Sequence, residues 1–271
     1  MGKQSYRRVL TIAGSDSGGG AGIQADLKTF AAHECYGMSV ITALTAQNTQ
    51  GVSGIHPAPV EFVAQQLDAV LSDIGVDAVK IGMLFSPALI ETVADKLKAY
   101  RVEHIVLDPV MIAQSGDTLL RADAVEALKT SLIPLAEIIT PNLPEAAVLL
   151  GQADVEERAM ADAAMQLAAL GCRNVLVKGG HGKGENSDDC LYLKAENRIL
   201  SLSGKRLETR NNHGTGCTLS SAIAARIAHG DDIETAVRQA KEYITEAIRA
   251  GAKYHIGHGH GPVHHFWRYW K

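Results

Sequence analysis

The segment Asn212–Thr218, with the sequence Asn-His-Gly-Thr-Gly-Cys-Thr, has the residue types of an anion-binding site. It follows an expected strand and begins an expected helix at residues 218–228. A helix N-terminus carries unpaired N–H groups and a partial positive charge, and glycines let consecutive N–H groups converge on an anion. The pattern fits an ordinary glycine-rich turn with a threonine cap equally well. The residues that would form the phosphate site are Gly214, Thr215, Gly216 and Cys217.

Charged side chains follow three other expected strands. Asp108 precedes Pro109, Glu145 follows Asn142 by three residues, and Lys178 precedes two glycines. Carboxylate oxygens suit Mg²⁺, which keeps several of its waters, and a lysine at a strand end could meet a phosphate. Each residue also has a structural interpretation: a capping box for Asn142 and Glu145, a turn for Asp108, and a surface position for Lys178.

The loop Gly14–Gly22 is rich in glycine and lies between an expected strand and an expected helix. Gly20, Gly22 and Ala25 satisfy the dinucleotide fingerprint G-x-G-x-x-A, but no acidic residue ends the second strand, at Thr45–Asn48. We therefore favour a loop whose backbone approaches a substrate closely, with a ligand-free turn as the alternative. The P-loop pattern G-x-x-x-x-G-K-[ST] does not occur, so phosphoryl chemistry would need another anion site.

The elements that must position these residues alternate along the chain. Short apolar runs predict strands and longer amphipathic segments predict helices, which indicates an α/β fold with a largely parallel sheet and helices on both faces. Ligands would then bind at the carboxyl ends of the strands. With no linker or repeat, we expect one domain over residues 1–271. The expected strands are 9–13, 39–45, 78–81, 104–108, 137–140, 174–177, 190–193, 199–202 and 207–209, and the expected helices are 23–32, 60–71, 88–100, 122–128, 145–150, 159–170, 218–228 and 233–250.

The composition excludes several classes of protein. The 271 residues carry 26 Lys and Arg against 30 Asp and Glu, a formal charge of −4, which gives no electrostatic basis for nucleic-acid binding. The four cysteines form no C-x-x-C pair and indicate reduced thiols in a cytoplasmic protein. No stretch approaches 18 apolar residues, so we expect no membrane span.

Histidines gather near the C-terminus, at 255, 258, 260, 264 and 265. Glycines at 257, 259 and 261 lie among them. Their spacing matches no tetrahedral zinc pattern, and no cysteine or carboxylate lies nearby. We expect a loop that packs on the body of the protein, with a non-catalytic metal-binding tail as the alternative.

Together, these motifs resemble the hydroxymethylpyrimidine kinase branch of the ribokinase-like superfamily. The resemblance covers nearly the whole chain, and several motifs are specific in their order and spacing. The matching segments are residues 11–30, 40–48, 80–83, 106–111, 115–117, 139–146, 177–181, 213–218 and 257–266.

This resemblance implies a three-layer α/β/α fold with a mostly parallel central sheet, and an enzyme that uses ATP and Mg²⁺. It implies two successive phosphorylations, of 4-amino-5-hydroxymethyl-2-methylpyrimidine and then of its monophosphate, for thiamine biosynthesis. It also implies a homodimer, because related kinases dimerise. A pyridoxal kinase or a dual-specificity enzyme is the nearest alternative, and a dinucleotide-binding oxidoreductase is the alternative from a different class.

By the same resemblance, the pyrimidine pocket would be made by the glycine loop and two side chains. Gln47 would hydrogen-bond the aminopyrimidine, because an amide offers a donor and an acceptor side by side, and Met83 would pack on the ring face. The other residues that would line this pocket are Asp26, Gly14, Gly20, Ala21 and Gly22.

The resemblance also assigns the phosphate side of the site. Lys178 would lie over the ATP phosphates, with Asn142 and Thr215 nearby, and Asp108 and Glu145 would place Mg²⁺. The backbone of 214–217 would form the anion hole for the transferring phosphoryl group. Much of the superfamily has an aspartate base where this chain has Cys217. We expect the helix terminus to lower the pKa of Cys217, so that its thiolate accepts a proton, chiefly in the first phosphorylation.

Overall fold

The computed structural model describes residues 5–111, 122–180 and 184–270. The matching segment 115–117 and His181 lie outside the described residues. The main sheet has eight strands in the described chain, in the order β10-β9-β8-β7-β6-β5-β1-β2. The strands are β1 (Arg8–Ala13), β2 (Tyr36–Ile41), β5 (Ala78–Ile81), β6 (Ile105–Leu107), β7 (Ile138–Ile139), β8 (Asn174–Val177), β9 (Asp189–Leu193) and β10 (Arg198–Leu202).

Six neighbouring strands of this sheet, β2, β1, β5, β6, β7 and β8, are parallel to one another. Next to β8, the strands β9 and β10 each pair in the antiparallel direction. The parallel strands are short apolar runs because both of their faces are covered by helices. Their carboxyl ends therefore meet at one edge of the sheet, and the loops that follow them share that edge. The expectation of a largely parallel sheet is confirmed.

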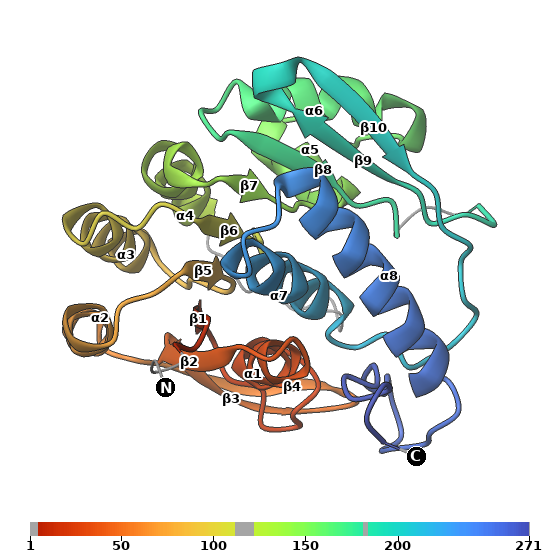
Figure 1. Cartoon of the computed structure of the whole chain (residues 1–271), viewed down its shortest axis with the longest axis horizontal. Helices are drawn as coiled ribbons and strands as arrows, with labels where there is room; N and C mark the ends of the chain where they lie inside the picture. The colour runs from red at the N-terminus through yellow and green to blue at the C-terminus, as the bar shows by residue number, and fades with distance from the viewer. Residues whose placement is uncertain (1–4, 112–121, 181–183, 271) are drawn as a thin grey trace.

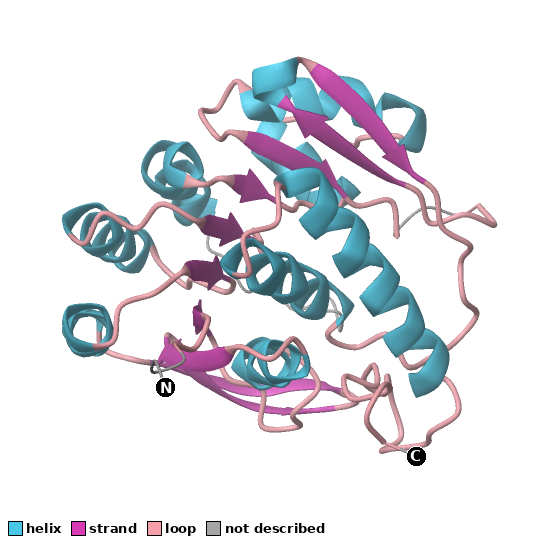
Figure 2. Cartoon of the chain, viewed as in Figure 1, coloured by secondary structure: helices cyan, strands magenta, loops and turns pink. Residues whose placement is uncertain are grey.

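Helices cover both faces of the sheet (Figures 1 and 2). Neighbouring strand residues alternate between two apolar cores: Leu10 packs with the helices of one face, and Val9 packs with those of the other. The three-layer α/β/α expectation is confirmed. One face carries α1 (Gly22–Ala32), α7 (Thr215–Ala228) and α8 (Ile233–Gly251), and the other carries α2 (Val60–Asp73), α3 (Pro87–Ala99), α4 (Ala122–Ala127), α5 (Leu143–Leu150) and α6 (Met160–Ala168).

A separate two-stranded hairpin, β3 (Ala43–Asn48) and β4 (Gly51–Pro57), corrects the prediction of one strand over 39–45. The chain leaves the main sheet at Thr42, whose buried hydroxyl donates to the backbone oxygen of Met83 at 2.8 Å. A β-bulge between Ala46 and Gln47 then changes the direction of the side chains. The predicted strand over 207–209 is wrong: these residues have no strand partner in the described chain and instead border a cavity.

The C-terminal tail follows α8 and packs near the tip of the β3–β4 hairpin (Figure 1). The backbone N–H of His260 donates to the backbone oxygen of Thr49 at 2.7 Å, and the ring of His265 lies 3.1 Å from the Thr218 hydroxyl. The described residues contain no group of three or more side chains that could hold a metal ion. The expectation of a packed loop is confirmed.

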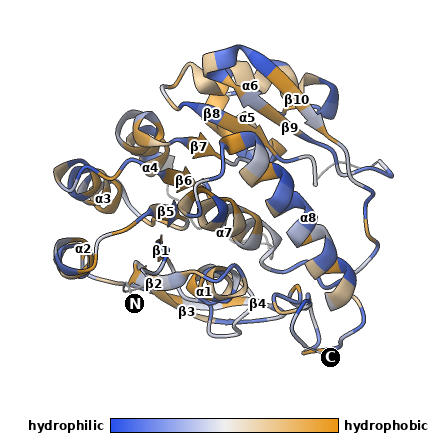
Figure 3. Cartoon of the chain, in the orientation of Figure 1, coloured by the Kyte–Doolittle hydropathy of each residue, from blue (hydrophilic) through white to orange (hydrophobic). Residues whose placement is uncertain are grey.

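Apolar residues from both sets of helices and from the strands form the two cores, whereas α8 carries many hydrophilic residues along its length (Figure 3). Among the described helices, none combines the length and the apolar character needed to cross a membrane.

Candidate active site

A cavity of about 810 Å³ lies at the carboxyl edge of the parallel strands. Loops from five strands reach it, as the predicted topology requires. The strand-end residues that line it are Gly14 after β1, Met83 after β5, Asp108 after β6, Asn142 after β7 and Lys178 after β8.

The N-terminus of α7 points into this cavity and is built on glycine. Gly214 has a φ of +78°, and a Cβ there would lie 1.9 Å from the backbone oxygen of Gly20, so another residue would clash. A Cβ on Gly216 would lie 3.4 Å from Lys178 Nζ and 3.6 Å from Asp108 Oδ2. The Thr215 hydroxyl donates to the backbone oxygen of Asn212 at 2.7 Å. The first residues of α7 therefore lie between the glycine loop and the charged side chains of Lys178 and Asp108.

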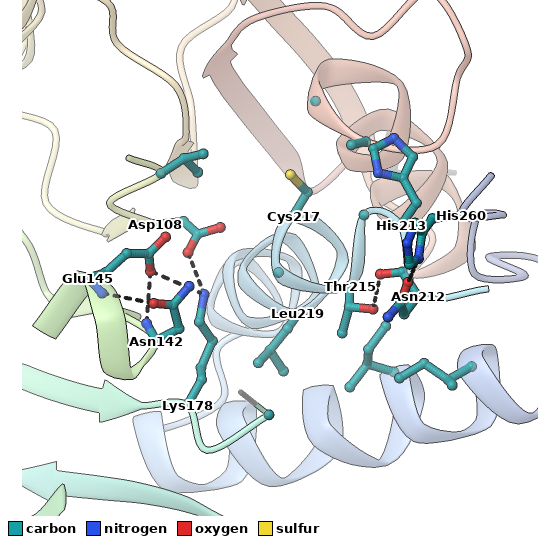
Figure 4. A pocket seen from close by; sticks show the side chains of 18 of the residues that line it. Asp108, Asn142, Glu145, Lys178, Asn212, His213, Thr215, Cys217, Leu219 and His260 are labelled. Carbon is teal, nitrogen blue, oxygen red and sulfur yellow. Dashed lines mark hydrogen bonds and ion pairs between the residues drawn. The ribbon is translucent and has the colours of Figure 1, made fainter. Parts of the chain in front are cut away.

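That charged cluster joins Asp108, Glu145 and Lys178 across three strand ends (Figure 4). Lys178 Nζ donates to Asp108 Oδ1 at 2.8 Å and lies 4.0 Å from Glu145 Oε2. The Asp108 carboxylate also accepts a hydrogen bond of 3.0 Å from the hydroxyl of Thr140. The lysine side chain is 13% exposed, so the cluster is largely removed from water but open to the cavity.

The three charged groups of the cluster shift one another's pKa values. Burial lowers the pKa of Lys178 and raises that of Asp108, but their mutual attraction, aided by Glu145 at the lysine and by Lys80 and Thr140 at the aspartate, outweighs burial. The pKa of Lys178 is therefore raised, and that of Asp108 is lowered. Burial raises the pKa of Glu145 to about 7, and Asp108 adds to this effect while Lys178 opposes it. Asp108 is therefore the charged partner of Lys178 at neutral pH, whereas Glu145 titrates near neutrality.

Glu145 has a structural task as well, because it completes a capping box at the start of α5. The Asn142 N–H donates to Glu145 Oε2 at 2.8 Å, and the Glu145 N–H donates to Asn142 Oδ1 at 2.9 Å. The structural interpretation of this pair is confirmed. It is compatible with a role at the cavity, since the cap holds the Glu145 carboxylate beside Lys178.

The glycine loop wraps around Asp16, a residue that the sequence analysis did not single out. Its buried carboxylate accepts hydrogen bonds from the N–H groups of Gly18, Gly20 and Ala21 at 2.8, 2.9 and 2.8 Å. His213, the residue before Gly214, has its Nε2 atom 2.9 Å from the same carboxylate and so links the glycine loop to the start of α7. An aspartate two residues before glycines is typical of a side-chain-stabilised turn, and that signal could have identified Asp16.

The structure brings most of the expected pyrimidine-pocket residues to the cavity. Gln47 lines it from the hairpin, and Met83 Sδ lies 3.2 Å from the position that a Cβ on Gly14 would occupy. Ala21 and Gly22 line it as well. Gly20 is instead covered by His213, whose Cδ2 lies 2.4 Å from the position of a Cβ on Gly20.

Asp26 requires a correction, because it lies beneath the pocket rather than in its lining. Its side chain is fully buried and is bonded by Thr11, Lys80 and Ser221. All of these contacts are 3.0 Å or shorter. Of the residues that the structure describes around the cavity, Lys80 belongs to the lining and Asp26 does not.

The expected pKa of Cys217 also requires a correction. Burial raises the pKa of this thiol to about 11, and the carboxylates of Asp26 and Asp108 add to the effect. Lys80 and the N–H of Gly22 act in the opposite direction but are outweighed. The helix terminus thus fails to produce a thiolate at neutral pH in the ligand-free chain. The other three cysteines are free and buried, in agreement with the expectation of reduced thiols.

Asp108 and Glu145 lie together beside Lys178 and could offer oxygens to a divalent cation, and among the described residues no third carboxylate, histidine or cysteine completes a metal-binding group with them. Two carboxylates are too few for a closed protein site. They fit a cation such as Mg²⁺, which keeps waters and takes further oxygens from substrate phosphates.

Comparisons with known proteins agree with this geometry. The family model described as phosphomethylpyrimidine kinase matches residues 16–264. A hydroxymethylpyrimidine/phosphomethylpyrimidine kinase of Rhizobium meliloti is 53% identical over 97% of this chain and 98% of its own length. A bifunctional thiamine biosynthesis protein of Geobacter sulfurreducens is 55% identical over 95% of this chain, which spans 52% of that longer protein.

Among solved structures, the Bacillus subtilis pyridoxal kinase in an ADP complex superimposes with a TM-score of 0.89 at 38% identity. The superposition covers 96% of this chain and 98% of that kinase. The match of the family model over most of the chain and the high identity to full-length relatives show that this chain belongs to the phosphomethylpyrimidine kinase family.

Proposed function

We propose that this kinase transfers the γ-phosphoryl group of ATP to the hydroxymethyl group of 4-amino-5-hydroxymethyl-2-methylpyrimidine and then phosphorylates the monophosphate to the diphosphate, for thiamine biosynthesis. One observation carries the proposal: the N-terminus of α7 lies between Gln47 and Met83 on one side and the Asp108–Lys178 pair on the other, within one cavity. A pyrimidine and a triphosphate would meet at this helix end.

The transfer requires positioning and stabilisation of charge more than covalent help. A bond forms between the hydroxymethyl oxygen and the γ-phosphorus, the bond to the β-phosphate oxygen breaks, and ADP leaves. The amides of 214–217 would stabilise the charge on the transferring group, and Lys178 would neutralise the phosphates. Leu219, Ile244 and Ile248 give the cavity an apolar wall on which a nucleotide base could pack.

Mg²⁺ fits Asp108 and Glu145 as a water-retaining ion, and when bound it would neutralise the charge of the ATP phosphates. Asp108 is held in its charged form by Lys178, whereas the pKa of Glu145 is raised to about 7 by burial. The protonation of Glu145 would therefore change with pH in the neutral range, whereas that of Asp108 would not. Without the cation, Asp108 is charged at neutral pH and Glu145 is partly protonated, and the charge of a bound cation would favour the carboxylate form of both.

The proton of the hydroxymethyl group concerns only the first step, because the second step starts from a phosphate that already carries negative charge. We propose that Cys217 accepts this proton through the minor thiolate form that its raised pKa leaves at neutral pH. The first phosphorylation would then accelerate with pH, whereas the second would not.

The pyridoxal alternative has one specific observation in its favour, the TM-score of 0.89 with a pyridoxal kinase. An amide at Gln47 is better suited to an aminopyrimidine, in which an amino group lies next to a ring nitrogen. We propose the pyrimidine as the main substrate, in a cytoplasmic homodimer whose single domain spans residues 1–271.

The test is a product-resolved assay with ATP and Mg²⁺. We expect the pyrimidine monophosphate to appear first and the diphosphate to follow, with kcat/KM for the pyrimidine above that for pyridoxal. A higher kcat/KM for pyridoxal would replace the proposal with its alternative. If the enzyme phosphorylated neither the pyrimidine nor pyridoxal, both functions would be rejected.

A further inference from the structure

The side chains of Asp16, His213, Gln47 and Thr45 form a hydrogen-bonded chain along the pyrimidine side of the cavity. His213 Nε2 lies 2.9 Å from Asp16 Oδ2 and 3.4 Å from the amide group of Gln47. The amide atom that faces His213 is placed as Nε2, and Gln47 Oε1 lies 3.1 Å from the Thr45 hydroxyl, which lies 2.7 Å from the backbone oxygen of Ser15. Asp16 at one end of this hydrogen-bonded series and Thr45 at the other both constrain where the protons between them lie.

At one end, Asp16 can only accept. One of its oxygens accepts from the N–H of Gly18, and the other accepts from the N–H groups of Gly20 and Ala21, so the backbone donors leave the carboxyl group without room for a proton. These bonds and His213 hold the pKa of Asp16 below its usual value despite burial. A contact of 2.9 Å with a carboxylate then requires a proton on His213 Nε2.

A protonated Nε2 has no lone pair, whether the ring is neutral or charged, so it cannot accept from the Gln47 amide. The group of Gln47 that faces it must therefore be the carbonyl oxygen, because an NH₂ group there would set donor against donor. The two ends of a glutamine amide have nearly the same shape, and their hydrogen-bond partners decide the orientation. The protons of this network therefore require the Gln47 amide to be turned over, so that Oε1 replaces Nε2 beside His213.

At the other end, Thr45 leads to the same orientation independently. Its hydroxyl has a single proton, and the carbonyl of Ser15 at 2.7 Å is the nearer acceptor. The hydroxyl oxygen is then free to accept from the NH₂ group of Gln47 at 3.1 Å. Both ends of the chain thus place the Gln47 oxygen toward His213 and the nitrogen toward Thr45.

We propose that Asp16, through His213, and Thr45 are positioning residues that lock the Gln47 amide in this orientation and so make the kinase selective for a 4-amino over a 4-oxo pyrimidine. The proposal rests on the proposed function, because it assumes that Gln47 reads the pyrimidine edge. A 4-amino ring offers a donor beside the N3 acceptor, whereas a 4-oxo ring offers an acceptor beside an N3–H donor. The oxo ring could match the locked amide only by turning over, which would carry its 5-hydroxymethyl group away from α7.

The lock itself is tested without substrate, by ¹⁵N NMR of the histidine rings in the wild-type chain. A His213→Gln variant assigns the signal. We expect Nε2 of His213 to carry a proton. A His213 ring that is protonated on Nδ1 alone would overturn the lock, and this result does not depend on which substrate the kinase takes.

The selectivity is tested by comparing kcat/KM for the 4-amino pyrimidine with that for its 4-oxo analogue. In Thr45→Val and Asp16→Asn we expect the ratio to fall by about tenfold or more, because one hydrogen bond no longer fixes the amide. The matched control Thr45→Ser keeps the hydroxyl and should keep the ratio, and the KM for ATP should stay unchanged in Thr45→Val.

An unchanged ratio in both Thr45→Val and Asp16→Asn would overturn the proposed selectivity. A wild-type chain that phosphorylates neither pyrimidine would reject the proposed function, and the NMR measurement would still decide whether the amide is locked.

Discussion

Two lysine–aspartate pairs lie near Cys217, and their surroundings differ. Lys80 and Asp26 are both fully buried, with a shortest contact of 2.9 Å, and Thr11 and Ser221 complete the hydrogen bonds of the carboxylate. Lys178 and Asp108 are at 2.8 Å, but Lys178 keeps 13% of its side chain exposed toward the cavity. The first pair is closed by the protein, and the second leaves its cation available to a ligand.

Burial and a short lysine–aspartate contact are common to both pairs and therefore do not distinguish them. Burial lowers the pKa of each lysine, but the neighbouring anionic groups, Asp26 foremost for Lys80 and Asp108 foremost for Lys178, together outweigh it and raise both pKa values. The two pairs differ in the exposure of the lysine, because Lys80 borders the cavity but is fully buried whereas Lys178 remains partly exposed. They differ also in the third titrating group, Glu145, which lies beside the open pair of Lys178 and Asp108. We therefore expect the closed pair to contribute to stability and the open pair to contribute to catalysis.

The largest effect is expected from Lys178→Met, which removes the cation of the open pair. The kcat for both phosphorylations should fall by about 100- to 1,000-fold, the usual loss when one stabilising donor is removed from a transition state. Steady-state kinetics with both acceptors measure it. A kcat within a few-fold of wild type in a folded variant would show that the open pair is structural.

The next effect is expected from Lys80→Met, which leaves the Asp26 carboxylate buried without its partner. The free energy of unfolding should fall by about 3–5 kcal/mol, as for other broken buried pairs. Denaturant titration measures the change. The double variant Asp26→Leu/Lys80→Met should recover most of the loss, and a double variant as unstable as the single one would contradict the view that the unpaired charge is the cause.

A smaller, pH-dependent effect is expected from Glu145→Gln, which keeps an amide able to complete the capping box. The pKa of Glu145 is raised from 4.5 to about 7, so between these values the folded wild type binds a proton that the unfolded chain has released. The free energy of unfolding of the wild type should therefore decrease as pH rises through this window, an effect that the variant lacks.

Denaturant titrations of wild type and Glu145→Gln at pH 5, 6, 7 and 8 check this sign. The stability of the variant relative to wild type should increase with pH up to about 7 and then level off. Parallel curves for the two chains would mean that burial does not raise the pKa of this carboxyl group.

The smallest effect is expected from Cys217→Ala. Because the pKa of the thiol is raised to about 11, the thiolate fraction should grow about tenfold per pH unit across the neutral range. The wild-type rate of the first phosphorylation should therefore rise from pH 7 to 9, and the variant should lose about tenfold in rate together with this slope. Equal losses in the two phosphorylations would contradict a role for Cys217 as the base.

The sequence was sufficient for most of the main sheet, because its parallel strands are short apolar runs that alternate with longer amphipathic helices. The hairpin strand β4 was missed, since Gly51–Pro57 contains two glycines and a proline and lacks the apolar alternation of a strand. The strand predicted over 207–209 was wrong, because a short apolar pattern there reflects contact with the cavity and not strand pairing.

For the site, the spacing predicted which strand ends and which helix terminus would converge. It could not predict which charges are closed off and which remain open, because that depends on side chains distant in sequence. Asp26 meets Lys80 and Ser221 only in the folded chain, and the same burial reverses the expected pKa shift of Cys217. The link between Asp16 and His213 joins residues 197 positions apart, beyond the reach of local patterns.

The central claim is that the open pair and the glycine loop hold the two substrates on either side of the N-terminus of α7. A crystal structure with the hydroxymethylpyrimidine and a non-hydrolysable ATP analogue tests it most directly. We predict that the hydroxymethyl oxygen lies within about 3.5 Å of the γ-phosphorus, with Lys178 on the phosphates and Gln47 on the pyrimidine edge. A pyrimidine bound away from Gln47, or phosphates that leave Lys178 paired only with Asp108, would contradict the account.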